Sequence, residues 1–99
     1  QSSVFAIWGA GHQALFTLSK TILKDCVSYI VDSSPSKQNL YAPGSDIKIY
    51  NPEHLKKHKP DVLIIACAGY NNEVLKIVYN MRLNLKKVYL LDGVNLVNV

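Results

Sequence analysis

The sequence predicts an α/β domain with three layers and a five-stranded parallel sheet, in the strand order 3-2-1-4-5. Short apolar runs of strand length alternate with segments whose apolar residues recur at helical spacing. Such alternation is typical of a parallel sheet with right-handed helical crossovers. A Gly-x-Gly turn directly follows the first apolar run, at the position of the phosphate-binding turn of Rossmann-like folds. We therefore expect a Rossmann-like fold.

A single domain accounts for the whole chain, residues 1–99, because this length suffices for one hydrophobic core. Hydrophobic residues make up 48% of the chain and charged residues 18%, which favours a packed core and argues against disorder. The chain begins with Gln1 and not with methionine. We therefore expect a C-terminal fragment of a larger protein, whose function belongs to a larger assembly.

The first half of the chain predicts three strands, one helix and one long loop. Apolar runs predict strands at 4–8 and 26–31, and a short alternating pattern predicts a third at 47–50. The helix is expected from about residue 13 to residue 24, where apolar residues have helical spacing. They are Leu15, Leu18, Ile22 and Leu23. The polar segment 32–46 contains two prolines and a glycine, which indicate a loop.

A brief helix and the most apolar strand are expected next. Asn51 can cap the helix with its side chain, and Pro52 suits a first helical turn, where no N–H is needed. The run 61–67 is the most strongly apolar strand of the chain. Gly69 interrupts the pattern and marks its end.

One more helix and one more strand complete the pattern. Asn71 or Asn72 can cap the helix. Its apolar stripe consists of Val74, Ile77, Val78 and Met81. The last strand is expected at 87–91, and it ends at Asp92-Gly93.

Charge and hydropathy exclude two classes of partner. Eleven basic residues against seven acidic ones give a formal net charge of +4, a modest surplus that suits anionic partners. The lysines are spread along the chain, and the densest basic segment, 54–59, contains no aromatic residue. We therefore expect no nucleic-acid partner. No apolar run reaches membrane-spanning length and no signal peptide is evident, so we expect no membrane partner and a cytoplasmic location.

Neither the cysteines nor the histidines predict a metal site. Cys26 and Cys67 lie in apolar, strand-like surroundings, which is typical of buried thiols in a reducing compartment. His54 and His58 have the spacing of two ligands on one helix face, but no third ligand is evident and lysines stand between them. We expect a solvated helix face there and no bound metal. No catalytic constellation is evident either, so no catalytic residue is assigned.

The Gly-x-Gly turn is the strongest candidate for a ligand site. Gly9, Gly11 and Ala14 fill the three small-residue positions of a dinucleotide fingerprint. Backbone N–H groups at the start of the following helix would face an anion. Asp32 ends the next strand, where an acid can accept hydrogen bonds from ribose hydroxyls. The cofactor-binding candidates are therefore Gly9, Gly11, His12 and Asp32.

The same residues have a second interpretation. Gly9 and Gly11 would then only make a tight connection from strand to helix, with Asp32 as an ordinary loop acid. His12 and Gln13 are large for a nucleotide loop, and Gln13 stands where a methyl-donor site usually has a third glycine. Binding of S-adenosylmethionine by this domain is therefore not expected.

The loop 32–46 should reach over the same edge of the sheet. Tyr41 can stack there on a base or sugar, and Lys37 can pair with a phosphate. The alternative is a Tyr41 that packs beneath an ordered loop and a Lys37 that is simply solvated. Both residues are kept as substrate-binding candidates.

The motifs after the glycine turn are more distinctive. In order they are Trp8 to Gly11, Asp32, Pro35-Ser36-Lys37-Gln38, Tyr41-Ala42-Pro43-Gly44, Pro52-Glu53 and Pro60-Asp61. With this series the chain resembles the C-terminal domain of the sugar C-methyltransferase family, over about residues 5 to 95. Enzymes of that family transfer a methyl group from S-adenosylmethionine to a nucleotide-linked deoxysugar. Before Tyr70 the chain has Ala68-Gly69, where the family typically has Trp-Asn.

The resemblance implies an accessory role. In that family the C-terminal domain is Rossmann-like, packs beside the S-adenosylmethionine-binding domain and helps to hold the sugar nucleotide. We therefore expect an accessory sugar-nucleotide-binding domain of an S-adenosylmethionine-dependent sugar C-methyltransferase-like enzyme, which is not catalytic alone. Its partners would be a nucleotide-linked sugar and the preceding domains of the same chain. Tyr70 joins Lys37 and Tyr41 as a substrate-binding candidate, and S-adenosylmethionine is assigned to the parent enzyme, with no cofactor for this domain.

Two other functions are compatible with the residues. One is a self-sufficient nucleotide-binding module of the NAD type, in a different sugar-modifying enzyme or a sensor, which the glycine fingerprint and Asp32 support. The other is a pure interaction domain, in which His12 and Tyr41 close over Gly9 and Gly11.

Overall fold

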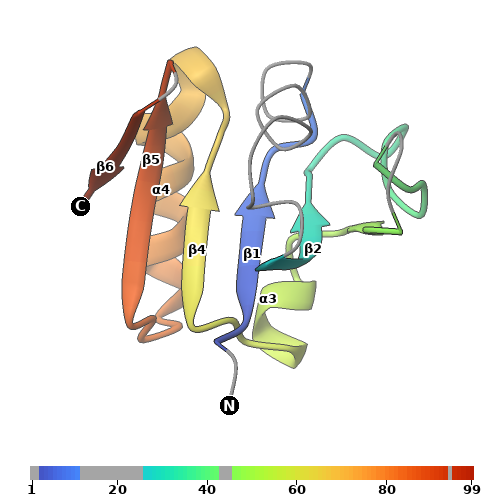
Figure 1. The fold of residues 1–99 in the computed structure, drawn as a ribbon, viewed down its shortest axis with the longest axis horizontal. Coiled ribbons are helices and arrows are strands. Elements are labelled where there is room, and N and C mark those ends of the chain that lie inside the picture. The colour runs from blue at the N-terminus through green and yellow to red at the C-terminus, as the bar shows by residue number, and fades with distance from the viewer. Residues whose placement is uncertain (1–2, 12–25, 43–45, 94) are drawn as a thin grey trace.

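The architecture is α/β, with helices packed on one sheet, as the sequence predicts (Figure 1). A computed structural model describes residues 3–11, 26–42, 46–93 and 95–99 of the chain. The six strands lie in the order β3-β2-β1-β4-β5-β6. They are β1 (Phe5–Trp8), β2 (Val27–Val31), β3 (Ile49–Tyr50), β4 (Val62–Ile65), β5 (Lys87–Asp92) and β6 (Asn95–Asn98). The predicted order of the first five strands is confirmed.

The sixth strand shows that the prediction of a five-stranded, wholly parallel sheet was wrong. β1 to β5 pair in parallel, whereas β6 runs antiparallel to β5, with Asp92 opposite Asn95. The chain reverses at Gly93, whose φ of +64° favours glycine. So short a turn joins only antiparallel neighbours, because a parallel partner needs a crossover of a dozen or more residues. All of β6 is exposed, so its sequence lacks the apolar run that marks the other strands.

The two described α-helices cover the same face of the sheet. They are α3 (His54–Lys57) and α4 (Asn71–Met81), and the 3-10 helix η1 (Ala68–Tyr70) leads into α4. Their buried side chains, Leu55, Val74 and Val78, belong to one core cluster with strand residues such as Trp8 and Leu63. Alternate strand residues, among them Ile7, Ile30 and Ile64, form a second cluster on the opposite face. The helix predicted at 13–24 lies outside the described residues.

Three details of the predicted elements were wrong. Ile77 is 47% exposed, because it lies on the flank of the α4 stripe, while Leu75 on the other flank packs against the core. Cys26 is exposed, since it precedes β2 and does not lie within it. The strand predicted at 61–67 ends at Ile65, because the chain then turns into η1.

In the described ranges no helix is long and apolar enough to cross a membrane.

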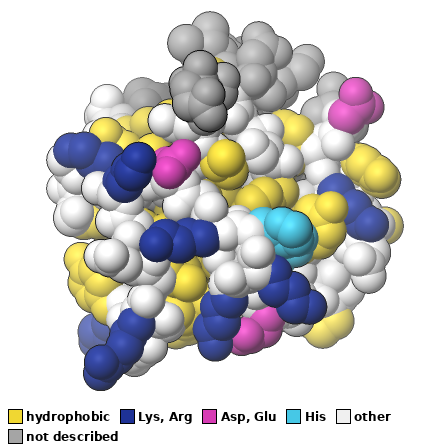
Figure 2. All heavy atoms as spheres, turned by 90° about the horizontal axis from the view of Figure 1, so that it is seen from below, with side chains coloured by type: hydrophobic (Ala, Val, Ile, Leu, Met, Phe, Trp, Pro, Cys, Tyr) yellow, Lys and Arg dark blue, Asp and Glu magenta, His cyan; other side chains and the backbone are white. Residues whose placement is uncertain are grey.

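α3 begins two residues later than predicted. The Asn51 side chain does accept a hydrogen bond from the Glu53 N–H, at 2.9 Å, as expected of a capping residue. The first helical residue, however, is His54, whose N–H donates to the Asn51 carbonyl at 2.9 Å. α3 lies near the amino-terminal ends of β1 and β2, and from this side several lysines surround a histidine on the surface (Figure 2).

Replacement of Arg82 by glycine is expected to stabilise the domain. Arg82 ends α4 with φ +54° and ψ +46°, a left-handed conformation that costs free energy in any residue with a β-carbon. We expect Arg82→Gly to raise the free energy of unfolding by about 0.5–1 kcal/mol. Denaturant unfolding of Arg82→Gly beside Arg82→Ala measures this. An equal gain in both variants would contradict the explanation, because alanine keeps the strained β-carbon.

Candidate functional site

The glycine turn lies at the carboxyl end of β1, between the ends of β2 and β4. The Gly9 N–H donates to the Val31 carbonyl at 2.8 Å, and the Ala66 N–H donates to the Trp8 carbonyl at 2.9 Å. Gly9 has φ +124°, and a β-carbon there would lie 2.4 Å from the Ala66 carbonyl oxygen. Gly9 is therefore required by the fold itself, because the ends of β1 and β4 approach each other closely.

Gly11 differs from Gly9 in both respects. Its φ lies outside the left-handed region, and a β-carbon on it would meet no atom within 4 Å. The fold therefore does not require a glycine at this position. Within the described ranges, no hydrogen bond engages the Gly11 N–H. An open N–H beside an open space is what a ligand group would need to approach the backbone.

Asp32 holds the glycine turn in place. One carboxylate oxygen accepts a hydrogen bond from the Ala10 N–H at 2.7 Å, and the other accepts one from the Ser34 N–H at 2.8 Å. The carboxylate therefore joins the turn after β1 to the loop after β2. Each oxygen has a second lone pair, so Asp32 can still accept hydrogen bonds from ribose hydroxyls, the role predicted for it.

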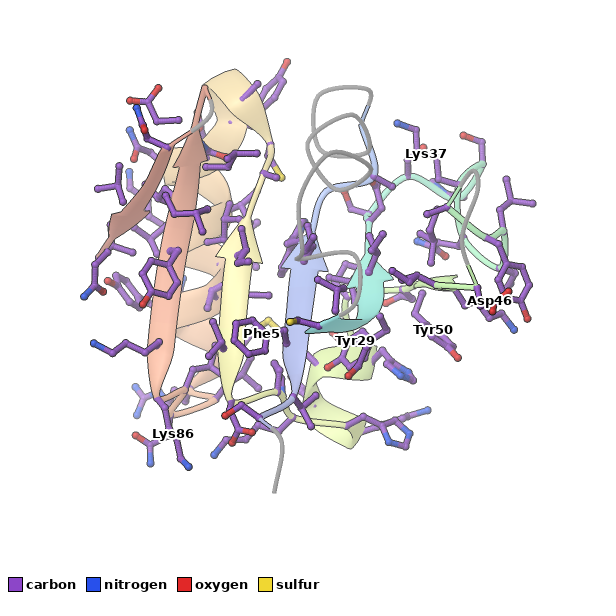
Figure 3. The ribbon with its side chains drawn as sticks, viewed as in Figure 1. Phe5, Tyr29, Lys37, Asp46, Tyr50 and Lys86 are labelled. Carbon is purple, nitrogen blue, oxygen red and sulfur yellow. The ribbon has the colours of Figure 1, made fainter. Side chains whose placement is uncertain are left out.

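Lys37 reaches the same turn from the loop after β2 (Figure 3). Its ammonium group donates to the Ala10 carbonyl oxygen at 3.3 Å, and its side chain is half-buried. The Gln38 side chain donates to the Asp32 carbonyl at 2.8 Å and so ties this loop to the strand end. Lys37 is thus not simply solvated, because its positive charge is held at the glycine turn by the Ala10 carbonyl oxygen.

Cys67 and Asn71 form the β4 side of the site. The Cys67 thiol donates to the Trp8 carbonyl at 3.3 Å. Burial, together with the negative charge of Asp32, raises the pKa of Cys67 to about 11. At neutral pH the sulfur keeps its proton and is a poor nucleophile. Cys67 therefore has a structural role in this edge.

Asn71 has a role that its sequence position did not reveal. It was predicted as a helix cap, but α4 begins at Asn71 and no side-chain cap bond is formed. Instead its side-chain oxygen accepts from the Cys67 N–H at 2.7 Å, and its amide nitrogen donates to the Leu91 carbonyl at 3.1 Å. Asn71 thus joins the carboxyl ends of β4 and β5. In the sequence, the only indication of this role is an asparagine shortly after a strand end. The same pattern equally indicates a helix cap, so it did not distinguish the two roles.

The remaining predicted site residues that the structure describes have no hydrogen bond to the glycine turn. Tyr70 ends η1, beyond β4, and is 72% exposed at the same edge of the sheet. Tyr41 is 59% exposed and pairs through its backbone with Lys48, beside β3. Among the described residues, no contact joins Tyr41 to the glycine turn. His12 and Ala14 lie outside the described residues.

His58, which follows α3, is exposed as predicted for a solvated helix face, whereas His54 in α3 is half-buried against other rings. The His54 ring stacks on the Tyr50 ring, with centroids 3.8 Å apart and planes 5° from parallel. His58 lies beside it, with a centroid distance of 4.5 Å. Burial, followed by the charges of His58 and Lys57, lowers the pKa of His54 from its ordinary value. In the described part of the chain, no three His, Cys, Asp or Glu residues are grouped to hold a metal ion.

Comparison with known proteins identifies both a family and a fold. The sequence profile of a family described as C-methyltransferase C-terminal domain matches residues 1–87. UDP-D-quinovosamine 4-dehydrogenase from Vibrio fischeri has a similar structure, with a TM-score of 0.73 and 20% identity, over 100% of this chain and 94% of that chain. No curated protein sequence matches the chain.

A second similar structure belongs to a longer protein. RSP, a Rex-family repressor, has a TM-score of 0.70 and 18% identity, over 97% of this chain and 48% of its own. RSP in complex with beta-NADH gives a TM-score of 0.64 and 17% identity, over 90% of this chain and 45% of that one. At such identities the likeness shows a shared Rossmann-like fold.

Proposed function

The chain belongs to the C-methyltransferase C-terminal domain family, and on that premise we propose that it is an accessory, sugar-nucleotide-binding domain of an S-adenosylmethionine-dependent sugar C-methyltransferase. It holds the nucleotide part of the substrate, and the domains that precede it supply the methyl donor and the methyl-transfer residues. The proposal includes the expected cytoplasmic location.

The observation that carries this proposal is the arrangement of polar groups around Gly11. The Lys37 ammonium lies 3.3 Å from the Ala10 carbonyl oxygen, on the side of that trans peptide opposite the Gly11 N–H. A backbone N–H that no described residue engages suits a phosphate group, the Lys37 ammonium adds positive charge to the other side of the turn, and the free lone pairs of Asp32 suit ribose hydroxyls. The exposed Tyr70 ring at the same edge can stack on a base or sugar.

Replacement of Gly11 by valine separates ligand binding from folding. The substitution puts a branched side chain where the diphosphate would approach, and its β-carbon meets no atom within 4 Å. We expect the Kd for thymidine diphosphate to rise by at least about tenfold, which corresponds to about 1.4 kcal/mol. The free energy of unfolding should change by less than about 1 kcal/mol. Isothermal titration and denaturant unfolding of the same protein preparation measure the two quantities.

Unchanged affinity in a folded Gly11→Val protein would overturn the diphosphate site. The chain alone should also transfer no methyl group from S-adenosylmethionine to a sugar nucleotide. Turnover by these 99 residues would contradict the accessory role.

A second candidate is a binding domain for NAD. The observation in its favour is Asp32, which ends β2 with lone pairs that can accept hydrogen bonds from the adenosine ribose. RSP, whose fold is similar, has a structure in complex with beta-NADH. Titration with NAD beside thymidine diphosphate discriminates between the two candidates. Saturable binding of NAD alone favours this second function, and binding of thymidine diphosphate alone favours the first.

A further inference from the structure

A second hollow, of about 500 Å³, lies away from the glycine turn, near the amino-terminal ends of β1 and β2. Its walls come from β2, the end of β3, α3 and the residues that flank them. The lining residues are Val4, Ser28, Tyr29, Tyr50, His54, His58 and Lys59. The volume falls in the range of small-molecule sites, which is about 300–1,000 Å³.

The aromatic wall of this hollow is already ordered. The stacked rings of Tyr50 and His54 are met edge-on by the Tyr29 ring, at 4.7 Å from His54 and 6.0 Å from Tyr50. Figure 3 shows Tyr29 and Tyr50 side by side. The Tyr29 hydroxyl donates to the His58 backbone carbonyl and so ties β2 to the end of α3. Leu55 is fully buried and anchors α3 to the sheet. A ligand would therefore meet a preformed surface, which lowers the entropic cost of binding.

The groups that line the hollow favour negative charge. None of the described lining residues is acidic, whereas Lys59 and the two imidazoles can all donate hydrogen bonds to an anion. Beyond the lining residues, the Lys48 ammonium lies 5.4 Å from the centre of the Tyr50 ring.

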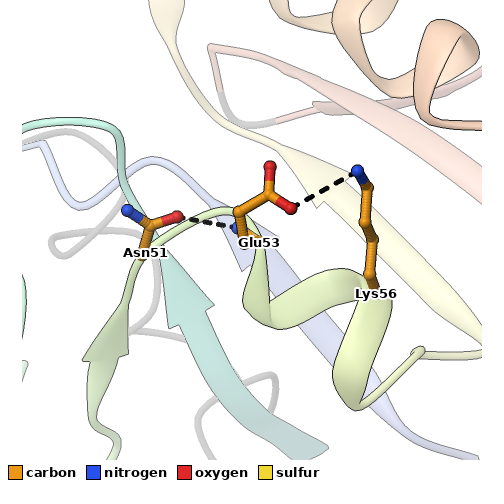
Figure 4. A network of polar contacts seen from close by, with 3 residues as sticks. All are labelled: Asn51, Glu53 and Lys56. Atoms are coloured by element: carbon orange, nitrogen blue, oxygen red, sulfur yellow. Dashed lines mark hydrogen bonds and ion pairs between the residues drawn. The ribbon is translucent and has the colours of Figure 1, made fainter.

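The two described acids that lie nearest to the lining residues in the sequence are held by other partners. Glu53 pairs with Lys56 at 3.3 Å (Figure 4). The Asp61 carboxylate accepts a hydrogen bond from the Val4 N–H at 2.8 Å and forms an ion pair with the Lys86 ammonium at 3.7 Å. Neither carboxylate is among the residues that line the hollow.

We propose that this hollow is a second ligand site, which binds the phosphate or sulfate group of a small molecule through His54, His58 and Lys59. The charged and titratable groups described around His54 are Tyr29 from β2, Tyr50 from β3, Lys48 directly before β3, and Glu53, Lys57 and His58 from the α3 segment. In the free protein burial, followed by the charges of the neighbouring cations, lowers the pKa of His54. A bound anion offsets those cations, so anion binding is coupled to uptake of a proton by His54.

Titration with sodium sulfate, followed by NMR of the imidazole protons, tests the site. Sulfate keeps the same charge from pH 5.5 to 7.5, so any pH dependence comes from the protein. Sodium chloride keeps the ionic strength constant. We expect a saturable shift of the His54 and His58 signals, with a Kd about tenfold lower at pH 5.5 than at pH 7.5, since one proton is taken up.

Variants show whether the effect belongs to this hollow. His58→Gln combined with Lys59→Gln changes two exposed side chains and should weaken sulfate binding at pH 5.5 by at least about tenfold, or about 1.4 kcal/mol. Lys76→Gln removes one charge from the exposed side of α4 and should leave the Kd unchanged within about twofold. Gly11→Val should also leave it unchanged, because the glycine turn is a separate site. A linear, non-saturable response, or equal weakening by Lys76→Gln, would overturn the proposal.

Discussion

Replacement of Gly9 by alanine is expected to lower the free energy of unfolding by about 3 kcal/mol or more. Two costs add at this position. A residue with a β-carbon is strained at φ +124°, and its β-carbon would lie 2.4 Å from the Ala66 carbonyl oxygen. That oxygen belongs to the backbone at the end of β4, so relief of the overlap would separate two paired central strands.

Denaturant unfolding followed by fluorescence measures this loss directly. Trp8 is the only tryptophan of the chain, is buried, and directly precedes Gly9. Gly11→Ala is the matched control: it adds the same methyl group two residues later, where no atom lies within 4 Å, and should change stability by less than about 0.5 kcal/mol. A loss below about 1 kcal/mol for Gly9→Ala would mean that the ends of β1 and β4 adjust easily.

Replacement of Asp32 by alanine is expected to cost about 2–4 kcal/mol of stability. The substitution removes the acceptors for the Ala10 N–H at 2.7 Å and the Ser34 N–H at 2.8 Å. Hydrogen bonds to a charged acceptor contribute more to stability than hydrogen bonds between neutral groups. Ala10 is also buried, so its N–H would lose its partner away from water. Asp32→Asn keeps one acceptor oxygen and should lose less.

Asp46→Ala provides the matched control for loss of an acid from the same loop (Figure 3). Asp46 is exposed, so its replacement should change stability by less than about 0.5 kcal/mol. Equal losses in the Asp32 and Asp46 variants would show that loop charge, and not the bonds to Ala10 and Ser34, accounts for the effect. The Asp32→Ala protein should also unfold with a single transition, because the carboxylate lies at the edge of the sheet and not in a separate unit.

Asp32 and Lys37 show how far sequence reasoning reached into the site. Both were predicted to lie near the glycine turn, since the carboxyl ends of parallel strands share one edge. The acid binds the N–H groups of Ala10 and Ser34, and the lysine binds the Ala10 carbonyl. The two bonds to Ala10 depend on side-chain reach between residues that are 22 and 27 positions apart in the chain. A motif specifies the neighbourhood of a residue, whereas hydrogen-bond partners are set by distances of a few tenths of an ångström.

Gly9 and Gly11 illustrate the same limit. In the sequence they are equivalent members of one fingerprint. The structure assigns the strained conformation to Gly9 and leaves Gly11 free of it. Only the approach of Ala66, 57 residues later in the chain, distinguishes the two.

The sequence by itself determined the Rossmann-like class, the family and the order of the first five strands, because buried parallel strands appear as apolar runs and right-handed crossovers leave few possible orders. Only the tertiary structure decided that β6 turns back on β5, that Asn71 joins two strand ends, and that His54 stacks on Tyr50. β6 is exposed, and Asn71 and His54 are polar residues whose partners come from other elements. The hydrophobic pattern that drives folding therefore carries no record of these contacts.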